Sequence, residues 1–130
     1  MPFMTWSESY TVNSYALDTQ HRKLFALVND LHDAIQEERS KAIIGASLDA
    51  LLAFAKTHFR DEENLLAKLK YYDLAFQKDE HNAFLVKIAG FQAQHNSGRI
   101  ALSMPMLDYL KNWLLNHIAK EDKKYSSFMR

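Results

Sequence analysis

Apolar residues recur at spacings of three and four along nearly the whole chain after residue 18. This spacing places them on one face of an α-helix, whereas a half-buried strand would alternate apolar and polar positions. Only three glycines and two prolines occur in the 130 residues. The pattern therefore predicts an all-α fold, and helices with short connections predict an antiparallel up-down four-helix bundle.

The boundaries of the helices follow from capping residues and pattern breaks. We predict helices over residues 19–38, 40–70 and 73–95, a fourth that starts at the Ser103-Met104-Pro105 segment, and a short terminal helix or tail from about residue 121. Asp18 or Thr19 and Asp73 are expected to cap the first and third helices, because short polar side chains accept hydrogen bonds from free N–H groups there. Residues 96–98 are expected to form a loop.

The chain is expected to form one domain over residues 1–130, with residues 1–17 as an extended N-terminal arm. This arm carries aromatic residues without helical periodicity and is expected to pack over the bundle. The aromatic residues of the arm are Phe3, Trp6, Tyr10 and Tyr15.

Composition excludes several classes of function. Sixteen basic residues balance sixteen acidic ones, so no long-range field attracts nucleic acid or an anionic membrane. With no cysteine, any metal site must use imidazole, carboxylate or amide groups. Because no segment resembles a targeting peptide or reaches membrane-spanning length, we expect a cytoplasmic protein without membrane insertion.

Histidines and carboxylates interrupt the apolar faces of all the predicted helices. The set is His21, His58 with Glu62 one turn later, His81, and His117 with Asp122. A lone inward histidine is more often a hydrogen-bonded core residue than a ligand. Burying this many polar groups is costly, however, and transition metals bind imidazoles and carboxylates together. Four faces that converge in one bundle therefore predict a metal site.

Two other histidines are expected not to be ligands. His32 lies at the flank of its apolar face, and His95 ends a helix, where a cation complements the helix dipole.

The residues described above resemble those of bacterial hemerythrins over nearly the whole chain. The resemblance rests on Trp6, the run 17–25 (LDTQHRKLF), the His58/Glu62 pair, the segment around His81, and the run 113–117 (WLLNH) with Asp122. It implies a four-helix bundle that holds two non-haem iron ions, bridged by two carboxylates and an oxo or hydroxo group.

The same resemblance assigns ligands to each iron. One iron would be held by His21 and His58, and the other by His81 and His117 with a third histidine. Glu62 and Asp122 would bridge the two. Gln77 stands where the family has its third histidine.

Gln77 leaves three alternatives open. Its amide oxygen binds iron, although more weakly than imidazole; or it holds a water on an exposed coordination position, which we favour; or the iron is bound poorly and partly lost. Asp73, one turn earlier, is an outside candidate for a replacement ligand, but helix capping explains it more simply.

Periodicity and resemblance disagree about the second bridging carboxylate. In a regular helix, Glu121 lies one turn beyond His117, whereas Asp122 lies about 140° around the helix from it. Only a wide turn or the end of the helix brings Asp122 inward. Periodicity alone would select Glu121, and the resemblance selects Asp122.

The function implied by the resemblance is reversible dioxygen binding at a diferrous centre, in an oxygen carrier or store. Dioxygen would bind at the iron held by His21 and His58, inside an apolar pocket. The residues matching this pocket are Leu24, Phe59, Trp113, Leu114 and Ile118. An oxygen-consuming protein is a possible partner.

No residue stands out as a nucleophile or general base for organic chemistry, so a hydrolase or transferase is not expected and the chain is interpreted as a non-enzyme. Three alternatives stay open. The chain could be a diiron redox enzyme acting on O2, peroxide or nitric oxide; an iron or oxygen sensor or iron store; or a bundle whose site has decayed.

Overall fold

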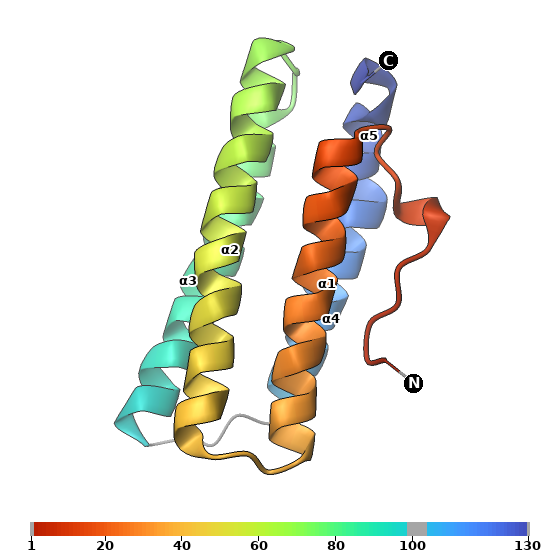
Figure 1. Ribbon diagram of the computed structural model, residues 1–130. Helices are drawn as coiled ribbons and strands as arrows, with labels where there is room; N and C mark the ends of the chain where they lie inside the picture. Colours follow the sequence, from red (N-terminus) through yellow and green to blue (C-terminus); the bar gives the residue numbers. More distant parts are fainter. Residues whose placement is uncertain (1, 99–103, 130) are drawn as a thin grey trace.

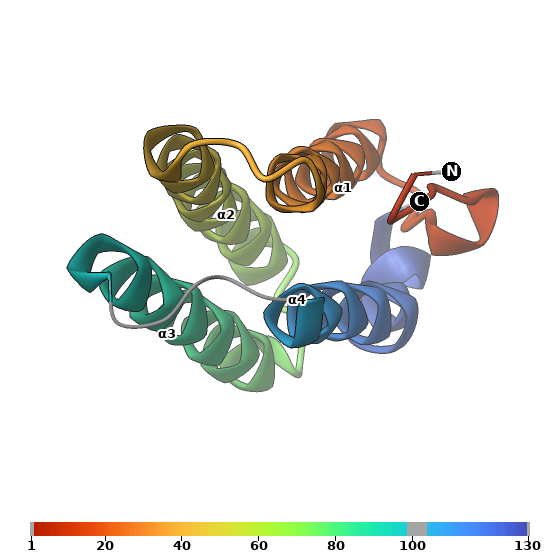
Figure 2. The same cartoon turned by 90° about the horizontal axis from the view of Figure 1, so that it is seen from below.

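Four long helices form an antiparallel bundle in the computed structural model, which describes residues 2–98 and 104–129. They are α1 (Tyr15–Gln36), α2 (Lys41–Lys68), α3 (Leu74–Ser97) and α4 (Met104–Asn116). Consecutive helices run in opposite directions (Figure 1) and surround a common axis when seen end on (Figure 2). The predicted all-α up-down bundle is confirmed.

Short helical segments complete the fold at both ends of the chain. They are the 3₁₀ turn η1 (Glu8–Tyr10), the π-helical turn η2 (His117–Asp122), α5 (Lys123–Tyr125) and the 3₁₀ turn η3 (Ser126–Met129). The last three continue α4, so the C-terminal end lies beside the start of α1 (Figure 1).

Helix α1 begins earlier than predicted, because Ser14 rather than Asp18 or Thr19 caps it. The Ser14 hydroxyl accepts a hydrogen bond from the Leu17 N–H at 3.2 Å. Asp18 lies inside the first turn, where its carboxylate accepts hydrogen bonds from the Val12 N–H at 2.9 Å and the Thr11 hydroxyl at 2.5 Å. The expected capping side chain therefore ties the arm to the helix instead.

The ends of α3 also differ from expectation. Asp73 occupies the N-cap position, but its side chain makes no capping hydrogen bond. At the other end the helix continues through residues expected to form a loop and stops at Gly98, whose φ of 73° is left-handed. This conformation costs glycine little, so it ends the helix. The predicted start of the fourth helix at Ser103 lies outside the described residues.

The arm packs over the bundle as predicted. Asn29 binds the Met4 backbone twice, accepting from its N–H at 2.7 Å and donating to its carbonyl at 2.9 Å. The rings of Trp6 and Tyr10 contact Phe25 edge-on, each at 5.6 Å between centroids. Tyr15, by contrast, belongs to α1 and is 84% exposed, so it was wrongly grouped with the packed aromatics.

The core is divided into two apolar clusters. The larger one fills most of the bundle and includes Leu24, Leu51, Phe59, Phe84 and Leu114. The smaller one closes the end of the bundle near the C-terminus and contains Val12, Leu17, Leu66, Tyr71 and Tyr125. Phe59 of the larger cluster and Leu66 of the smaller one flank the buried carboxylate of Glu62 along α2, so apolar packing encloses this polar region from two directions.

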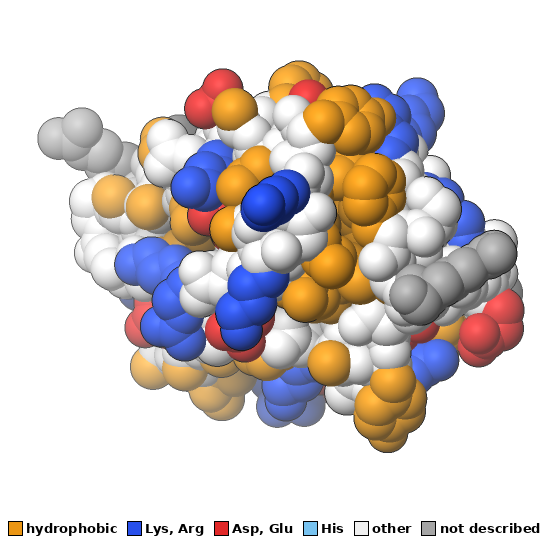
Figure 3. Space-filling model, turned by 90° about the horizontal axis from the view of Figure 1, so that it is seen from above, with side chains coloured by type: hydrophobic (Ala, Val, Ile, Leu, Met, Phe, Trp, Pro, Cys, Tyr) orange, Lys and Arg blue, Asp and Glu red, His pale blue; other side chains and the backbone are white. Residues whose placement is uncertain are grey.

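Hydrophobic side chains also show on the outside of the closed end. Seen from above, they form a patch among basic and acidic groups (Figure 3). Tyr72 is 75% and Phe128 41% exposed, and both rings contact the buried ring of Tyr71, at 4.9 and 5.3 Å between centroids.

Helix α2 departs from the expectation that no segment reaches membrane-spanning length. By length and composition alone it could cross a membrane. Its apolar face, including Leu48, Leu51 and Ala55, is buried in the bundle between α1 and α3. Core helices pass the same compositional test because both environments select apolar residues.

Candidate metal centre

Six buried polar side chains meet at one level of the bundle. Each of the four long helices supplies at least one of them, when η2 is counted as the continuation of α4. They are His21 from α1, His58 and Glu62 from α2, His81 from α3, and His117 and Asp122 from η2, and none is more than 3% exposed. The residues expected to converge are therefore brought together.

Glu62 faces both pairs of histidines. Its Oε1 lies 2.9 Å from His81 Nε2, while its Oε2 lies 3.3 Å from His21 Nε2 and 3.6 Å from His58 Nε2. Each carboxylate oxygen therefore serves a different side of the cluster.

Asp122 spans the cluster in the same way. Its Oδ2 lies 3.3 Å from His21 Nε2, and its Oδ1 lies 3.1 Å from His117 Nε2. The Nε2 atoms of His81 and His117 are 3.1 Å apart. Among the described residues, two overlapping groups able to hold a cation result. One contains Glu62, His81, His117 and Asp122, and the other contains His21, His58 and Glu62.

The donor set fits two iron ions. Imidazoles and carboxylates are ligands that suit non-haem iron. Glu62 Oε1 and Asp122 Oδ2 accept no well-formed hydrogen bond from the described residues, although both are buried. Leaving such atoms unpaired is costly, and a bound cation on each side would satisfy them.

Partners on the outer ring nitrogens orient two of the histidines. His58 Nδ1–H donates to Gln20 Oε1 at 2.7 Å, and Gln20 in turn donates to Asp61 at 3.2 Å. His81 Nδ1–H donates to Glu63 Oε2 at 2.8 Å. Such contacts fix the tautomer and leave Nε2 free to bind metal. Sequence reasoning missed Gln20 and Glu63; their only signal is that each adjoins a ligand position.

Burial and the charges of neighbouring ligand residues shift the pKa values of the histidines and carboxylates in the cluster. Burial lowers the pKa of His21, but hydrogen bonds and attraction to Asp122 and Glu62 outweigh burial and raise it to about 10. For His58, burial prevails over attraction to Glu62, and its pKa falls to about 4. Burial alone would raise the pKa of Glu62, but the surrounding histidines hold it well below its usual range. Burial and repulsion from Glu62 would raise the pKa of Asp122, but His117 and His21 lower it. Both carboxylates therefore favour the ionised form, which binds cations.

The π-helical turn η2 explains how Asp122 enters the site. A π-helix bonds residue i to residue i+5, so Asp122 follows His117 by one such turn. Glu121 is half-buried instead and pairs with the exposed Lys124 at 2.9 Å. The choice of Glu121 from regular periodicity is wrong, and the wide turn required for Asp122 is confirmed.

Gln77 lies beside the cluster and is only 1% exposed. Its Nε2 donates to Asp122 Oδ1 at 3.1 Å. Its Oε1 has no hydrogen-bond partner among the residues that the structure describes. Asp73, the outside candidate, belongs to neither group of potential ligands found within the described ranges.

Aromatic rings cover one side of the cluster. Phe59 stacks on His81 with centroids 4.0 Å apart, and Trp113 stacks on His117 at 4.5 Å. The other residues matched to the pocket, Leu24, Leu114 and Ile118, are buried, whereas Trp113 is half-buried.

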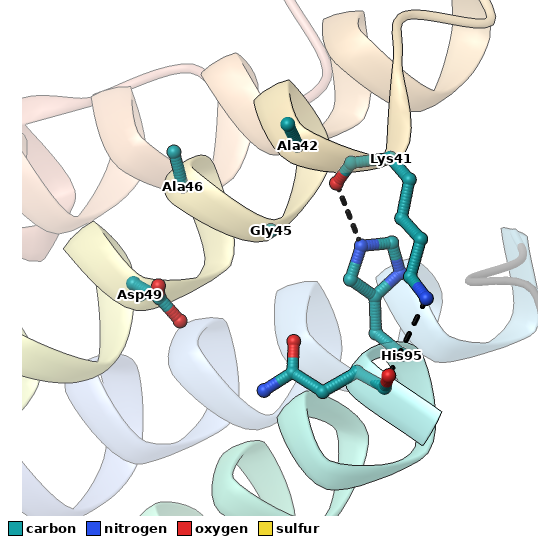
Figure 4. A pocket seen from close by; sticks show the side chains of 7 residues that line it. Lys41, Ala42, Gly45, Ala46, Asp49 and His95 are labelled. Carbon is teal, nitrogen blue, oxygen red and sulfur yellow. Dashed lines mark hydrogen bonds between the residues drawn. The ribbon is translucent and has the colours of Figure 1, made fainter. Parts of the chain in front are cut away.

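His32 and His95 lie outside both groups of potential ligands. His32 stacks on Phe3 at 4.4 Å. His95 lies in the last turn of α3, as predicted, although the helix continues to Ser97. Its ring packs against Gly45, where an added Cβ would lie 3.4 Å from the ring. Its Nε2–H donates to the Lys41 carbonyl at 2.9 Å, next to a surface pocket between α2 and α3 (Figure 4).

The bundle and its shared carboxylates define a class of protein: a four-helix bundle with a dinuclear site of histidines and carboxylates. The model of the hemerythrin HHE cation-binding domain matches residues 12–128. The chain therefore belongs to the hemerythrin family, whose members are non-haem diiron oxygen-binding proteins.

Individual relatives agree over almost the full length. The bacteriohemerythrin of Methylococcus capsulatus is 36% identical over 96% of this chain and 95% of its own. A hemerythrin-like protein of Naegleria gruberi is 34% identical over 98% of this chain and 94% of its own. A solved wild-type hemerythrin is 33% identical, superposes with a TM-score of 0.92 and covers 98% of both chains.

Proposed function

We propose that this chain is a reversible dioxygen carrier or store with two non-haem irons bridged by an oxo or hydroxo group. The observation that supports the proposal best is the sharing of two carboxylates between two histidine pairs. His21 and His58 would hold one iron, His81 and His117 the other, and Glu62 and Asp122 would bridge them. When bound, the diferrous pair supplies the electrons for dioxygen binding.

The chain's own residues have three tasks in this proposal. The histidine pairs and the carboxylates would hold the two ions. Gln20 and Glu63 orient His58 and His81 through their outer nitrogens. The pocket residues Leu24, Phe59, Trp113, Leu114 and Ile118 would admit dioxygen and exclude water, because an apolar surround disfavours the escape of charged, reduced oxygen.

A gas-exchange experiment tests this proposal. Protein loaded with ferrous iron and kept anaerobic should develop a visible charge-transfer absorption on addition of O2 and lose it on purging with argon over several cycles. His58→Ala should abolish the cycle, whereas His32→Ala, which changes a histidine outside the cluster, should retain it. Irreversible oxidation on the first exposure would contradict a carrier role.

A redox enzyme acting on O2, peroxide or nitric oxide is a second candidate, supported by Gln77. An amide beside the second histidine pair binds iron more weakly than imidazole, so that iron would be more accessible to reactants. Steady consumption of one of these substrates with an added reductant would favour the enzyme over the carrier.

We further propose a cytoplasmic location and an oxygen-consuming protein as the recipient of the bound gas. The burial of the apolar face of α2 inside the bundle supports a protein that does not insert into membranes. Fractionation of cells, and co-purification with an oxidase under low oxygen, would test the two parts separately.

A further inference from the structure

The two sides of the cluster offer equal numbers of protein ligand atoms once Asp122 Oδ2, 3.3 Å from His21 Nε2, is counted with the group of His21, His58 and Glu62. Toward one position point His21 Nε2, His58 Nε2 and one oxygen of each carboxylate. Toward the other point His81 Nε2, His117 Nε2 and the remaining oxygens, Glu62 Oε1 and Asp122 Oδ1. With a shared oxo or hydroxo group, each six-coordinate iron would keep one position open.

The side chain of Gln77 is held by Asp122, so its orientation does not depend on binding iron at the His81–His117 side. One N–H of its amide donates to Asp122 Oδ1 at 3.1 Å, which fixes the side chain against a bridging carboxylate. Within the described part of the chain, the only hydrogen bond found for this amide nitrogen is the one to Asp122, and Oε1 is buried without a partner. A buried acceptor is costly to leave unpaired, so a small polar ligand beside it would be stabilised.

We propose that Gln77 leaves a second ligand position open at the His81–His117 side and forms the hydrogen-bonding wall of that position. This inference rests on the diiron function proposed above. The ligand class is a small anion or water: the amide N–H would donate to an anion, and Oε1 would accept from a protonated ligand.

Antiparallel packing places Gln77 and the pocket residue Phe59 at different levels of the bundle. Gln77 precedes His81 by one turn in α3, and Phe59 precedes Glu62 by nearly one turn in α2. Because α2 and α3 run in opposite directions (Figure 1), Gln77 and Phe59 lie on opposite sides of the ligand level. Gln77 therefore borders the His81–His117 side from the end of the bundle opposite to Phe59, whose ring stacks on His81.

Azide titration of the oxidised, iron-loaded protein tests the inference, with iron content measured first. We expect two azides per pair of irons in the parent protein and one in Gln77→His, because the imidazole fills the second position. Gln77→Ala should keep two azides but bind the second about tenfold more weakly, since a hydrogen bond to an anion is lost. Gln94→His, an exposed glutamine of the same helix, is the matched control and should behave like the parent.

The outcomes separate the two proposals. Fewer than two irons in the parent would overturn the diiron function, and this inference with it. Two irons with a single azide in both the parent and Gln77→His would overturn the second position alone. Equal affinity of the second azide in the parent and Gln77→Ala would overturn the role of the amide.

Discussion

The hydroxyl of Tyr125 donates a hydrogen bond to Glu62 Oε2 at 2.6 Å. Tyr125 is fully buried and follows Asp122 by three residues, just beyond the π-helical turn. The turn that brings one bridging carboxylate into the site therefore also places the donor that holds the other. This donor was missed in the sequence, where Tyr125 reads as an ordinary apolar position of a short terminal helix.

Replacing Tyr125 should loosen the metal on the side of His21 and His58. In Tyr125→Phe the carboxylate of Glu62 loses a charge-assisted hydrogen bond, and loss of such outer partners typically weakens metal binding about 10- to 100-fold. The rate of iron loss to a chelator measures the effect.

Tyr71→Phe is the matched control for this test. The Tyr71 hydroxyl is also buried in the smaller cluster, but it has no hydrogen-bond partner among the described residues. Equal rates of iron loss from Tyr125→Phe and Tyr71→Phe would show that the tyrosine contributes packing alone.

The π-helical turn predicts opposite effects for two neighbouring carboxylates. Asp122→Asn removes a bridging charge and should reduce the iron content below two per chain. Glu121→Gln removes only a partly exposed ion pair with Lys124, which contributes little because solvent screens it, and should leave iron content unchanged. Elemental analysis of both variants after the same iron loading measures the effect. A lower iron content in Glu121→Gln than in Asp122→Asn would place Glu121 in the site.

Metal should stabilise the fold without creating it. The two apolar clusters enclose the ligand residues from two directions, so the metal-free protein should remain helical. Iron binds preferentially to the folded state and should therefore raise the Tm of the protein. Circular dichroism with and without a chelator checks this. Loss of the helical signal at room temperature on chelation would mean that the metal is structural.

Shielding of the cluster by Phe59 gives a further prediction. Phe59→Ala removes the ring stacked on His81, which should cost about 3–5 kcal/mol of stability and admit water to the site. Oxidation of the oxygenated protein should then accelerate, as followed by the decay of its absorption. An unchanged decay rate would show that Phe59 does not help to exclude water from the site.

The sequence predicted the helices and the converging ligands because both follow from a regular period. His21, His58, Glu62 and His81 lie on helical faces whose neighbours are apolar, so their inward direction could be read directly. Asp122 could not, because the local backbone departs from the α-helical period over residues 117–122. Only the resemblance to hemerythrins identified it.

Contacts between different helices, or between the arm and a helix, could not be predicted from the periodicity of apolar residues. Asp18 resembles a helix cap, yet it binds the arm at Thr11 and Val12, while Ser14 caps the helix. Similar short polar residues compete for the same role, and tertiary contacts decide between them. The orienting contacts of Gln20 and Glu63 depend in the same way on which helices become neighbours.

The central claim is that two histidine pairs and two shared carboxylates hold two metal ions, and an anaerobic titration with ferrous iron tests it most directly. Iron bound per chain would be counted after removal of the excess, beside Glu62→Gln, which removes a bridging charge. The account predicts saturation at two irons per chain and fewer in Glu62→Gln. Saturation of the parent at one iron, or no binding, would contradict it.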